Sequence, residues 1–169
     1  MQIIKRTVPN DRDNALLLHC ATLATEAMEA GNHPFAALLA DTEGRVLLTQ
    51  GNRYSDGGSV MHCETLLVFE AVKRYSREFL SHCTLYTSVE PCAMCTGALY
   101  WSGITRLVYG LSERDLLSMT GGHEENPTFD LSSTEVLSRG QRAVEVCGPT
   151  DDEALRERIA ADHRDYWSR

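Results

Sequence analysis

The sequence lacks any apolar run long enough to cross a membrane. No stretch of its 169 residues approaches the roughly 20 consecutive apolar residues that a membrane-spanning helix needs. Residues 1–10 also lack the apolar segment and the small-residue cleavage site of a signal peptide. We therefore expect a soluble, cytoplasmic protein that does not associate with a membrane.

Basic residues are also in short supply. The chain has 16 lysines and arginines against 24 aspartates and glutamates, which gives a formal net charge of −8 at pH 7. A protein that binds nucleic acid usually presents a basic face to the phosphates. The acidic balance therefore favours a small-molecule substrate over a nucleic-acid partner. A local basic patch would still be compatible with this charge, and acidity alone also keeps a protein soluble.

The chain has six cysteines, and nothing in the sequence indicates the secreted setting in which an even number would suggest disulfides. In a reducing compartment, cysteines act as metal ligands, as catalysts or as small buried apolar residues. Cys20, Cys83 and Cys147 stand in or beside regular apolar patterns, so we predict that they belong to the core. Cys63 is treated below, and Cys92 and Cys95 remain for chemistry.

The hydrophobic pattern predicts one domain over residues 1–169, because 43% hydrophobic residues suffice for one core. Helical spacing predicts helices over residues 13–30, 62–75, 91–101 and 151–167. Short apolar runs predict strands over residues 35–40, 46–48, 84–88, 106–109 and 143–147. Residues 54–59 and 118–133 are predicted to be loops. This alternation indicates a three-layer α/β/α sandwich.

Three residues of the kinds that bind zinc stand at the predicted starts of helices. They are His62, Cys92 and Cys95, and the two cysteines form the motif Cys92-Ala93-Met94-Cys95. Two intervening residues allow both sulfurs to reach one ion from the first turn of a helix, and zinc prefers thiolate and imidazole ligands. The pattern predicts a Zn²⁺ cofactor.

Glu64 stands two residues after His62, close enough to face the same ion. Three protein ligands leave the fourth tetrahedral position open, which is typical of a catalytic zinc site. A carboxylate beside that position can move protons, so Glu64 is the candidate catalytic residue. A Cys-x-x-Cys pair alone would equally suit a redox pair, and a structural zinc protein or an inactive binding partner is the competing class. Glu64 argues against that class.

The complete pattern, His62-Cys63-Glu64 followed by Pro91-Cys92-Ala93-Met94-Cys95, resembles the signature of zinc-dependent deaminases. The chain is similar to the cytidine deaminase-like superfamily over roughly residues 13–110, and most clearly to its guanine deaminases and tRNA adenosine deaminases. The resemblance implies a five-stranded mixed sheet, a homodimer, and hydrolytic release of ammonia from an amino-bearing ring, with Glu64 carrying the protons.

The resemblance also implies several contacts with the substrate. Asn52 would contact the base, although it could instead cap a turn. The backbone amide of Cys63 would meet a substrate oxygen. Phe35 would line the pocket, although it could be a core residue, and His33 would touch the substrate unless it is merely an exposed loop residue. Cys63 replaces the alanine usual in the family, and we interpret it as a small buried residue rather than an extra thiol that could ligate or oxidise.

Among possible substrates, His33-Pro34-Phe35 and Tyr100-Trp101 resemble guanine deaminases, so guanine or a related purine-like ring is the first expectation. A tRNA wobble adenosine deaminase and a cytosine-type deaminase are the alternatives. Specificity residues are expected within residues 112–129, and the candidates there are Asp115, His123, Glu124 and Phe129. Tyr166-Trp167 is equally consistent with closing a pocket and with packing the last helix.

Overall fold

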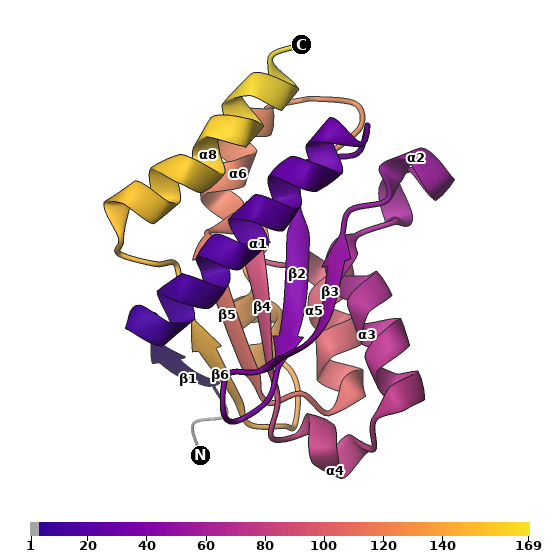
Figure 1. Ribbon diagram of the computed structural model, residues 1–169, viewed down its shortest axis with the longest axis vertical. Helices are drawn as coiled ribbons and strands as arrows, with labels where there is room; N and C mark the ends of the chain where they lie inside the picture. Colours follow the sequence, from indigo (N-terminus) through magenta and orange to yellow (C-terminus); the bar gives the residue numbers. More distant parts are fainter. Residues whose placement is uncertain (1–3) are drawn as a thin grey trace.

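The computed structural model describes residues 4–169, which form one mixed β-sheet with helices on both faces (Figure 1). Within these residues the sheet has six strands in the order β1-β6-β5-β4-β2-β3. The strands are β1 (Ile4–Thr7), β2 (Ala36–Ala40), β3 (Val46–Gly51), β4 (Thr84–Val89), β5 (Arg106–Leu111) and β6 (Val144–Cys147). Strand β2 is antiparallel to β3 and β4, whereas the pairs β4–β5, β5–β6 and β1–β6 are parallel. The predicted α/β class with a mixed sheet is confirmed.

Two layers of helices cover the sheet (Figure 1). One layer contains α1 (Asp11–Glu29), α6 (Glu113–Thr120) and α8 (Glu153–Trp167), and the other contains α3 (Cys63–Arg74), α5 (Ala93–Ser102) and α7 (Ser133–Ser138). Short helices α2 (Tyr54–Gly57) and α4 (Arg77–Leu80) stand in the connections before and after α3. None of the helices among the described residues is long and apolar enough to cross a membrane.

Strand β2 shows how the sequence divides the core between these layers. Ala37 and Leu39 pack into the cluster that includes α3, while Leu38 and Ala40 pack into the cluster that includes α1 and α8. Successive side chains of a strand point to opposite faces, so a strand covered on both sides needs apolar residues throughout. All five residues of β2 are buried accordingly.

The expectation of five strands is wrong by one, because β1 adds a parallel edge strand beside β6. It pairs Ile4 with Val144 and Thr7 with Cys147. Lys5 and Arg6 are exposed, so this strand lacks the apolar run by which the other parallel strands were recognised. An edge strand of four residues with two charged side chains gives little signal in the sequence.

Other differences concern the connections. Residues 54–59 are not an open loop, because α2 and a turn of 3₁₀ helix over Gly58–Val60 occupy this segment. Helix α6 extends to Thr120 and α7 begins at Ser133, so the irregular segment is confined to residues 121–132. Pro91 precedes the N-cap Cys92 instead of opening the helix itself. Helices α6 and α7 have only eight and six residues, which are too few helical turns for a periodic pattern to show in the sequence.

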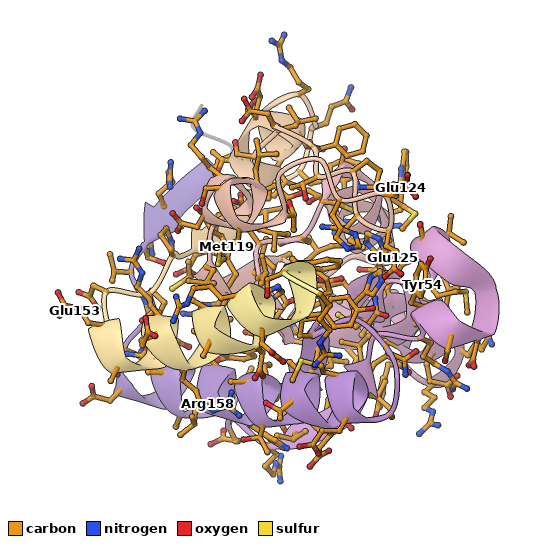
Figure 2. All side chains as sticks on the ribbon, turned by 90° about the horizontal axis from the view of Figure 1, so that it is seen from above. Tyr54, Met119, Glu124, Glu125, Glu153 and Arg158 are labelled. Atoms are coloured by element: carbon orange, nitrogen blue, oxygen red, sulfur yellow. The ribbon has the colours of Figure 1, made fainter. Side chains whose placement is uncertain are left out.

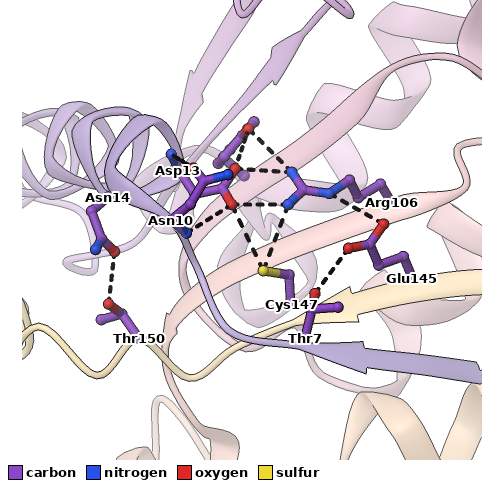
Figure 3. A network of polar contacts seen from close by, with 9 residues as sticks. Thr7, Asn10, Asp13, Asn14, Arg106, Glu145, Cys147 and Thr150 are labelled. Carbon is purple, nitrogen blue, oxygen red and sulfur yellow. Dashed lines mark hydrogen bonds and ion pairs between the residues drawn. The ribbon is translucent and has the colours of Figure 1, made fainter.

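A buried polar network fastens α1 to the centre of the sheet (Figure 3). Both oxygens of the Asp13 carboxylate accept hydrogen bonds from the Arg106 guanidinium at 2.9 Å, and Oδ1 also accepts one from the Tyr86 hydroxyl at 2.8 Å. The backbone N–H of Asn10 donates to the same carboxylate and completes a capping box at the start of α1. Burial alone would raise the pKa of Asp13, but the hydrogen bonds from Arg106 and Tyr86 outweigh it and lower the pKa.

Substitution of Asp13 by asparagine is expected to lower the free energy of unfolding by about 3 kcal/mol, because it leaves the half-buried Arg106 charge without its partner. Chemical denaturation at pH 7 measures this change. Because folding lowers the pKa of Asp13, its full contribution to stability is present at pH values above its ordinary pKa of about 3.9. The difference in stability between variant and wild type should therefore shrink as the pH falls below that value. Glu70→Gln, in an exposed ion pair, should cost less than about 1 kcal/mol. Equal losses in both variants would refute this account.

Candidate active site

The first turns of α3 and α5 bring together three donor atoms. His62 is the N-cap of α3, Cys92 is the N-cap of α5, and Cys95 lies in the first turn of α5. The Nδ1 atom of His62 lies 3.4 Å from the sulfur of Cys92 and 3.5 Å from the sulfur of Cys95. All three donor atoms lie within 4.8 Å of one another. The positive ends of the helix dipoles at these N-termini favour thiolates.

These distances fit a zinc ion. Tetrahedral zinc bonded at its usual lengths to sulfur and imidazole nitrogen separates the two donors by about 3.6 Å. The separations from His62 Nδ1 to both sulfurs match this value. Among residues 4–169, His62, Cys92 and Cys95 are the only group of three such donors close enough to hold one ion. Cys63 is fully buried and does not belong to this group, as expected for a core residue.

The surroundings of the two sulfurs differ, because the hydrogen bond with Cys92 and then burial raise the pKa of Cys95, whereas the pKa of Cys92 is lowered. A hydrogen bond from the Cys95 thiol, followed by one from His62, lowers the pKa of Cys92, although burial acts in the opposite direction. The hydroxyl of Thr65 donates to the sulfur of Cys95 at 3.1 Å. Cys92 therefore reaches its metal-binding, deprotonated form more readily than an ordinary thiol.

A small pocket opens beside these donors. It offers about 30 Å³ to a water-sized molecule, little more than one water occupies. Side chains of both motifs and of several distant segments form its wall, namely Phe35, Asn52, His62, Cys63, Glu64, Glu90, Cys92, Glu113, Leu116 and Asn126. A ring-shaped substrate therefore needs the covering side chains to move on entry.

Glu64 lies in this pocket as the sequence predicted. Its side chain is buried, and the Thr87 hydroxyl donates to Glu64 Oε1 at 2.7 Å. The same hydroxyl lies 3.1 Å from the carbonyl oxygen of Val89, so its single proton serves one of the two acceptors. This contact from β4 holds the carboxylate next to His62 and leaves its other oxygen for a ligand.

The structure also places Asn52, Phe35 and Cys63 in the pocket wall. The Oδ1 atom of Asn52 accepts the backbone N–H groups of His33 and Tyr54 at 3.2 and 2.9 Å. Asn52 is thus a turn cap, and this role fixes its orientation. Its Nδ2 amide group remains as the donor that it can offer to a ligand.

His33 does not line the pocket, and it is buried rather than exposed. Its Nε2 pairs with the Glu125 carboxylate at 2.8 Å, and its ring stacks on Tyr54 with the centroids 4.1 Å apart. Tyr166 donates its hydroxyl to the same carboxylate at 2.9 Å. Figure 2 shows Glu125 beside Tyr54, close to the end of α8. Burial lowers the pKa of His33 more than the Glu125 carboxylate raises it.

The four candidates expected between residues 112 and 129 lie outside the pocket wall, namely Asp115, His123, Glu124 and Phe129. Asp115 instead faces Arg156 of α8 at 3.7 Å. Trp167 is buried and donates to His163 Nδ1 at 3.0 Å, so it packs the last helix.

Sequence reasoning missed four residues of the pocket wall, namely Glu90, Glu113, Leu116 and Asn126. Burial first, and then the negative charges of Cys92 and Glu64, raise the pKa of Glu113 to about 8. Glu90 stands within the motif Glu90-Pro91-Cys92, so its position offered a signal. The others carry none, because only the tertiary fold brings α6 and the segment after it to the metal donors.

Comparison with known proteins agrees with this site. Residues 10–111 match the family described as the cytidine and deoxycytidylate deaminase zinc-binding region. The chain belongs to this family of zinc-dependent enzymes, which catalyse hydrolytic deamination.

Relatives with different substrates share the similarity. A probable cytosine deaminase of Schizosaccharomyces pombe is 37% identical over 159 residues, which are 94% of this chain and 94% of that protein. A guanine deaminase of Bacillus subtilis is 33% identical over 100 residues, which are 59% of this chain and 64% of that protein. The solved structure of guanine deaminase from Nitrosomonas europaea has a TM-score of 0.69 at 26% identity, covering 97% of this chain and 88% of that one.

Replacing Cys92 by serine is expected to weaken zinc binding by more than about 100-fold, because the loss of a direct ligand exceeds the loss of a supporting contact. Elemental analysis of purified protein and competition with a chelator measure this change. Cys83→Ser is the matched control, since Cys83 is a free cysteine that is not one of the three donors. Full zinc content in Cys92→Ser would contradict the assignment.

Proposed function

We propose that this protein is a zinc-dependent hydrolytic deaminase of a small amino-bearing nucleobase or a related heterocycle. One observation carries the proposal. A three-donor metal site and the Glu64 carboxylate face the same buried pocket. In this proposal His62, Cys92 and Cys95 hold the ion, which when bound supplies a more acidic water at its fourth position.

Glu64 would move the protons of the reaction. It takes a proton from the attacking water and delivers it to a ring nitrogen of the substrate as the new C–O bond forms. It then transfers the second proton of the water to the amino group, which leaves as ammonia when the C–N bond breaks. The oxo product and ammonia account for all the atoms of the substrate and the water. The Thr87 hydroxyl keeps the carboxylate aligned for both transfers.

Asn52 and the backbone amide of Cys63 would orient the ring. The free Nδ2 group of Asn52 suits an acceptor atom on the heterocycle, and the N–H of Cys63 suits a substrate oxygen. Phe35 would pack against the flat face of the ring. In this proposal His33 does not contact the substrate. It acts indirectly, because it pairs with Glu125, the neighbour of Asn126 in the pocket wall.

Two rings are the candidate substrates. Guanine or a related purine is supported by the similarity to the guanine deaminase structure and by Phe35 after Pro34. Cytosine is supported by the probable cytosine deaminase of Schizosaccharomyces pombe. The similarity to that protein covers 94% of this chain and so includes α6 and the segment after it, which form part of the pocket wall. The net charge of −8 argues against a tRNA substrate, because RNA binding usually needs a basic surface. We also propose one deaminase domain over residues 1–169 and a cytoplasmic location, where thiolate ligands stay reduced.

A homodimer is a further part of the proposal. Apolar side chains are exposed on α3 and α5, which lie side by side on one face of the molecule (Figure 1). Trp101 is 73% exposed, and Phe69, Val72 and Met94 are also exposed on these two helices. Large exposed apolar side chains on neighbouring helices are typical of a protein interface.

Glu64→Gln is expected to retain zinc and to lose at least about 100-fold in kcat, because the amide cannot accept and return a proton. Ammonia release and zinc content, measured on the same preparation, separate the two effects. Glu70→Gln on the same helix is the control, since its side chain points to solvent. Wild-type turnover in Glu64→Gln would rule out the proposed role.

A screen of ammonia release is expected to show turnover of guanine, cytosine or a close analogue by the zinc-loaded protein, and none of an anticodon stem-loop. The reason is that a chain with a net charge of −8 is poorly suited to bind the phosphates of an RNA. Activity on the stem-loop without any on free rings would refute the choice of substrate.

Trp101→Asp is expected to shift the protein from dimer to monomer, because it replaces the most exposed apolar side chain of these two helices by a charge. Sedimentation velocity measures the change. Val8→Asp is the control, since Val8 is also exposed but lies after β1, away from α3 and α5. A wild-type protein that sediments as a monomer would disprove the dimer.

A further inference from the structure

Glu113 is an acidic residue of the pocket to which the proposed reaction gives no task. It is only 4% exposed, and it lines the pocket together with Glu64 and Asn52. Its carboxylate makes no hydrogen bond with any residue between 4 and 169. Its oxygens are open to the pocket rather than sealed in the core, so this group can accept a hydrogen bond from a ligand that brings a donor.

The backbone around Glu113 is held firmly by another carboxylate. Glu90 Oε2 accepts the backbone N–H of Glu113 at 2.9 Å, while Oε1 accepts the backbone N–H of Ser133 at 2.8 Å and its hydroxyl at 2.6 Å. Glu90 is buried and comes two residues before the metal donor Cys92. One carboxylate thereby joins the starts of α6 and α7 to the metal-binding motif, which fixes Glu113 relative to the metal donors.

We propose that Glu113 accepts a hydrogen bond from a ring N–H of the substrate and thereby selects free nucleobases over their nucleosides. This inference rests on the proposed function and narrows its substrate class. A free base carries a hydrogen on the ring nitrogen that bears the sugar in a nucleoside. The sugar removes that donor and leaves the buried carboxylate unpaired, which a site built for a hydrogen bond does not tolerate. Guanine and cytosine both supply such an N–H group.

Steady-state kinetics of Glu113→Ala on a base and its nucleoside, guanine with guanosine and cytosine with cytidine, test the inference. The wild type is expected to prefer the free base. Glu113→Ala should lower kcat/KM for the base by about 10-fold, mainly through KM, because a hydrogen bond to the ring is lost in the bound ground state. It should leave the rate on the nucleoside unchanged or raised. An equal loss on base and nucleoside would overturn the inference.

Asp115→Asn is the matched control, because Asp115 lies on the same helix and faces Arg156 rather than the pocket. It should behave like the wild type with every substrate.

Binding provides a second test, which does not depend on turnover. Calorimetry on the zinc-loaded Glu64→Gln variant, which should not convert its substrate, would compare guanine with 9-methylguanine and cytosine with 1-methylcytosine. We expect the ring with the free N–H to bind at least tenfold more tightly. Equal affinities, or no binding of any of the four rings, would overturn the role of Glu113. Tight binding of the free base to this variant, with no ammonia release by the zinc-loaded wild type, would instead refute the proposed reaction and leave the role of Glu113 standing.

Discussion

The short separation between the Nδ1 atom of His62 and the sulfurs of Cys92 and Cys95 is the constraint on which the rest of the site depends. It requires the N-termini of α3 and α5 to lie next to each other, and the two helices do pack together over the sheet. Once His62 caps α3, Glu64 in its first turn is carried into the same pocket. Glu90 then ties α6 and α7 to this point through hydrogen bonds to their first residues.

The sequence predicted the parts of the site that lie close together in the chain or recur as a motif. The spacing of His62, Glu64, Cys92 and Cys95 was sufficient for the metal donors and the carboxylate, because each follows from the first turn of a helix. It was not sufficient for contacts between distant segments. His33 and Glu125 are 92 residues apart, and nothing near either one indicates their pairing. Strand β1 was missed for a related reason, since its charged residues gain their place only by pairing with β6.

The motifs determine the reaction, whereas contacts between distant segments determine the choice of substrate. Family membership and the donor geometry agree on hydrolytic deamination, because both depend on the two motifs. Relatives named for cytosine and for guanine share those motifs, so the motifs cannot choose the ring. In our account the choice falls to the wall that α6 and the following segment contribute, where Glu113 and Asn126 face the pocket. A structural zinc site would need neither this wall nor a carboxylate beside the metal donors.

X-ray absorption spectroscopy at the zinc edge of the metal-loaded wild-type protein tests the central claim most directly, because it counts the atoms bound to the ion. Our account predicts two sulfur atoms at about 2.3 Å and two lighter atoms at about 2.0 Å, one from the imidazole and one from a water. A third sulfur would bring Cys63 into the ligand set and close the position that the reaction needs. That result would contradict a catalytic site and support a structural one.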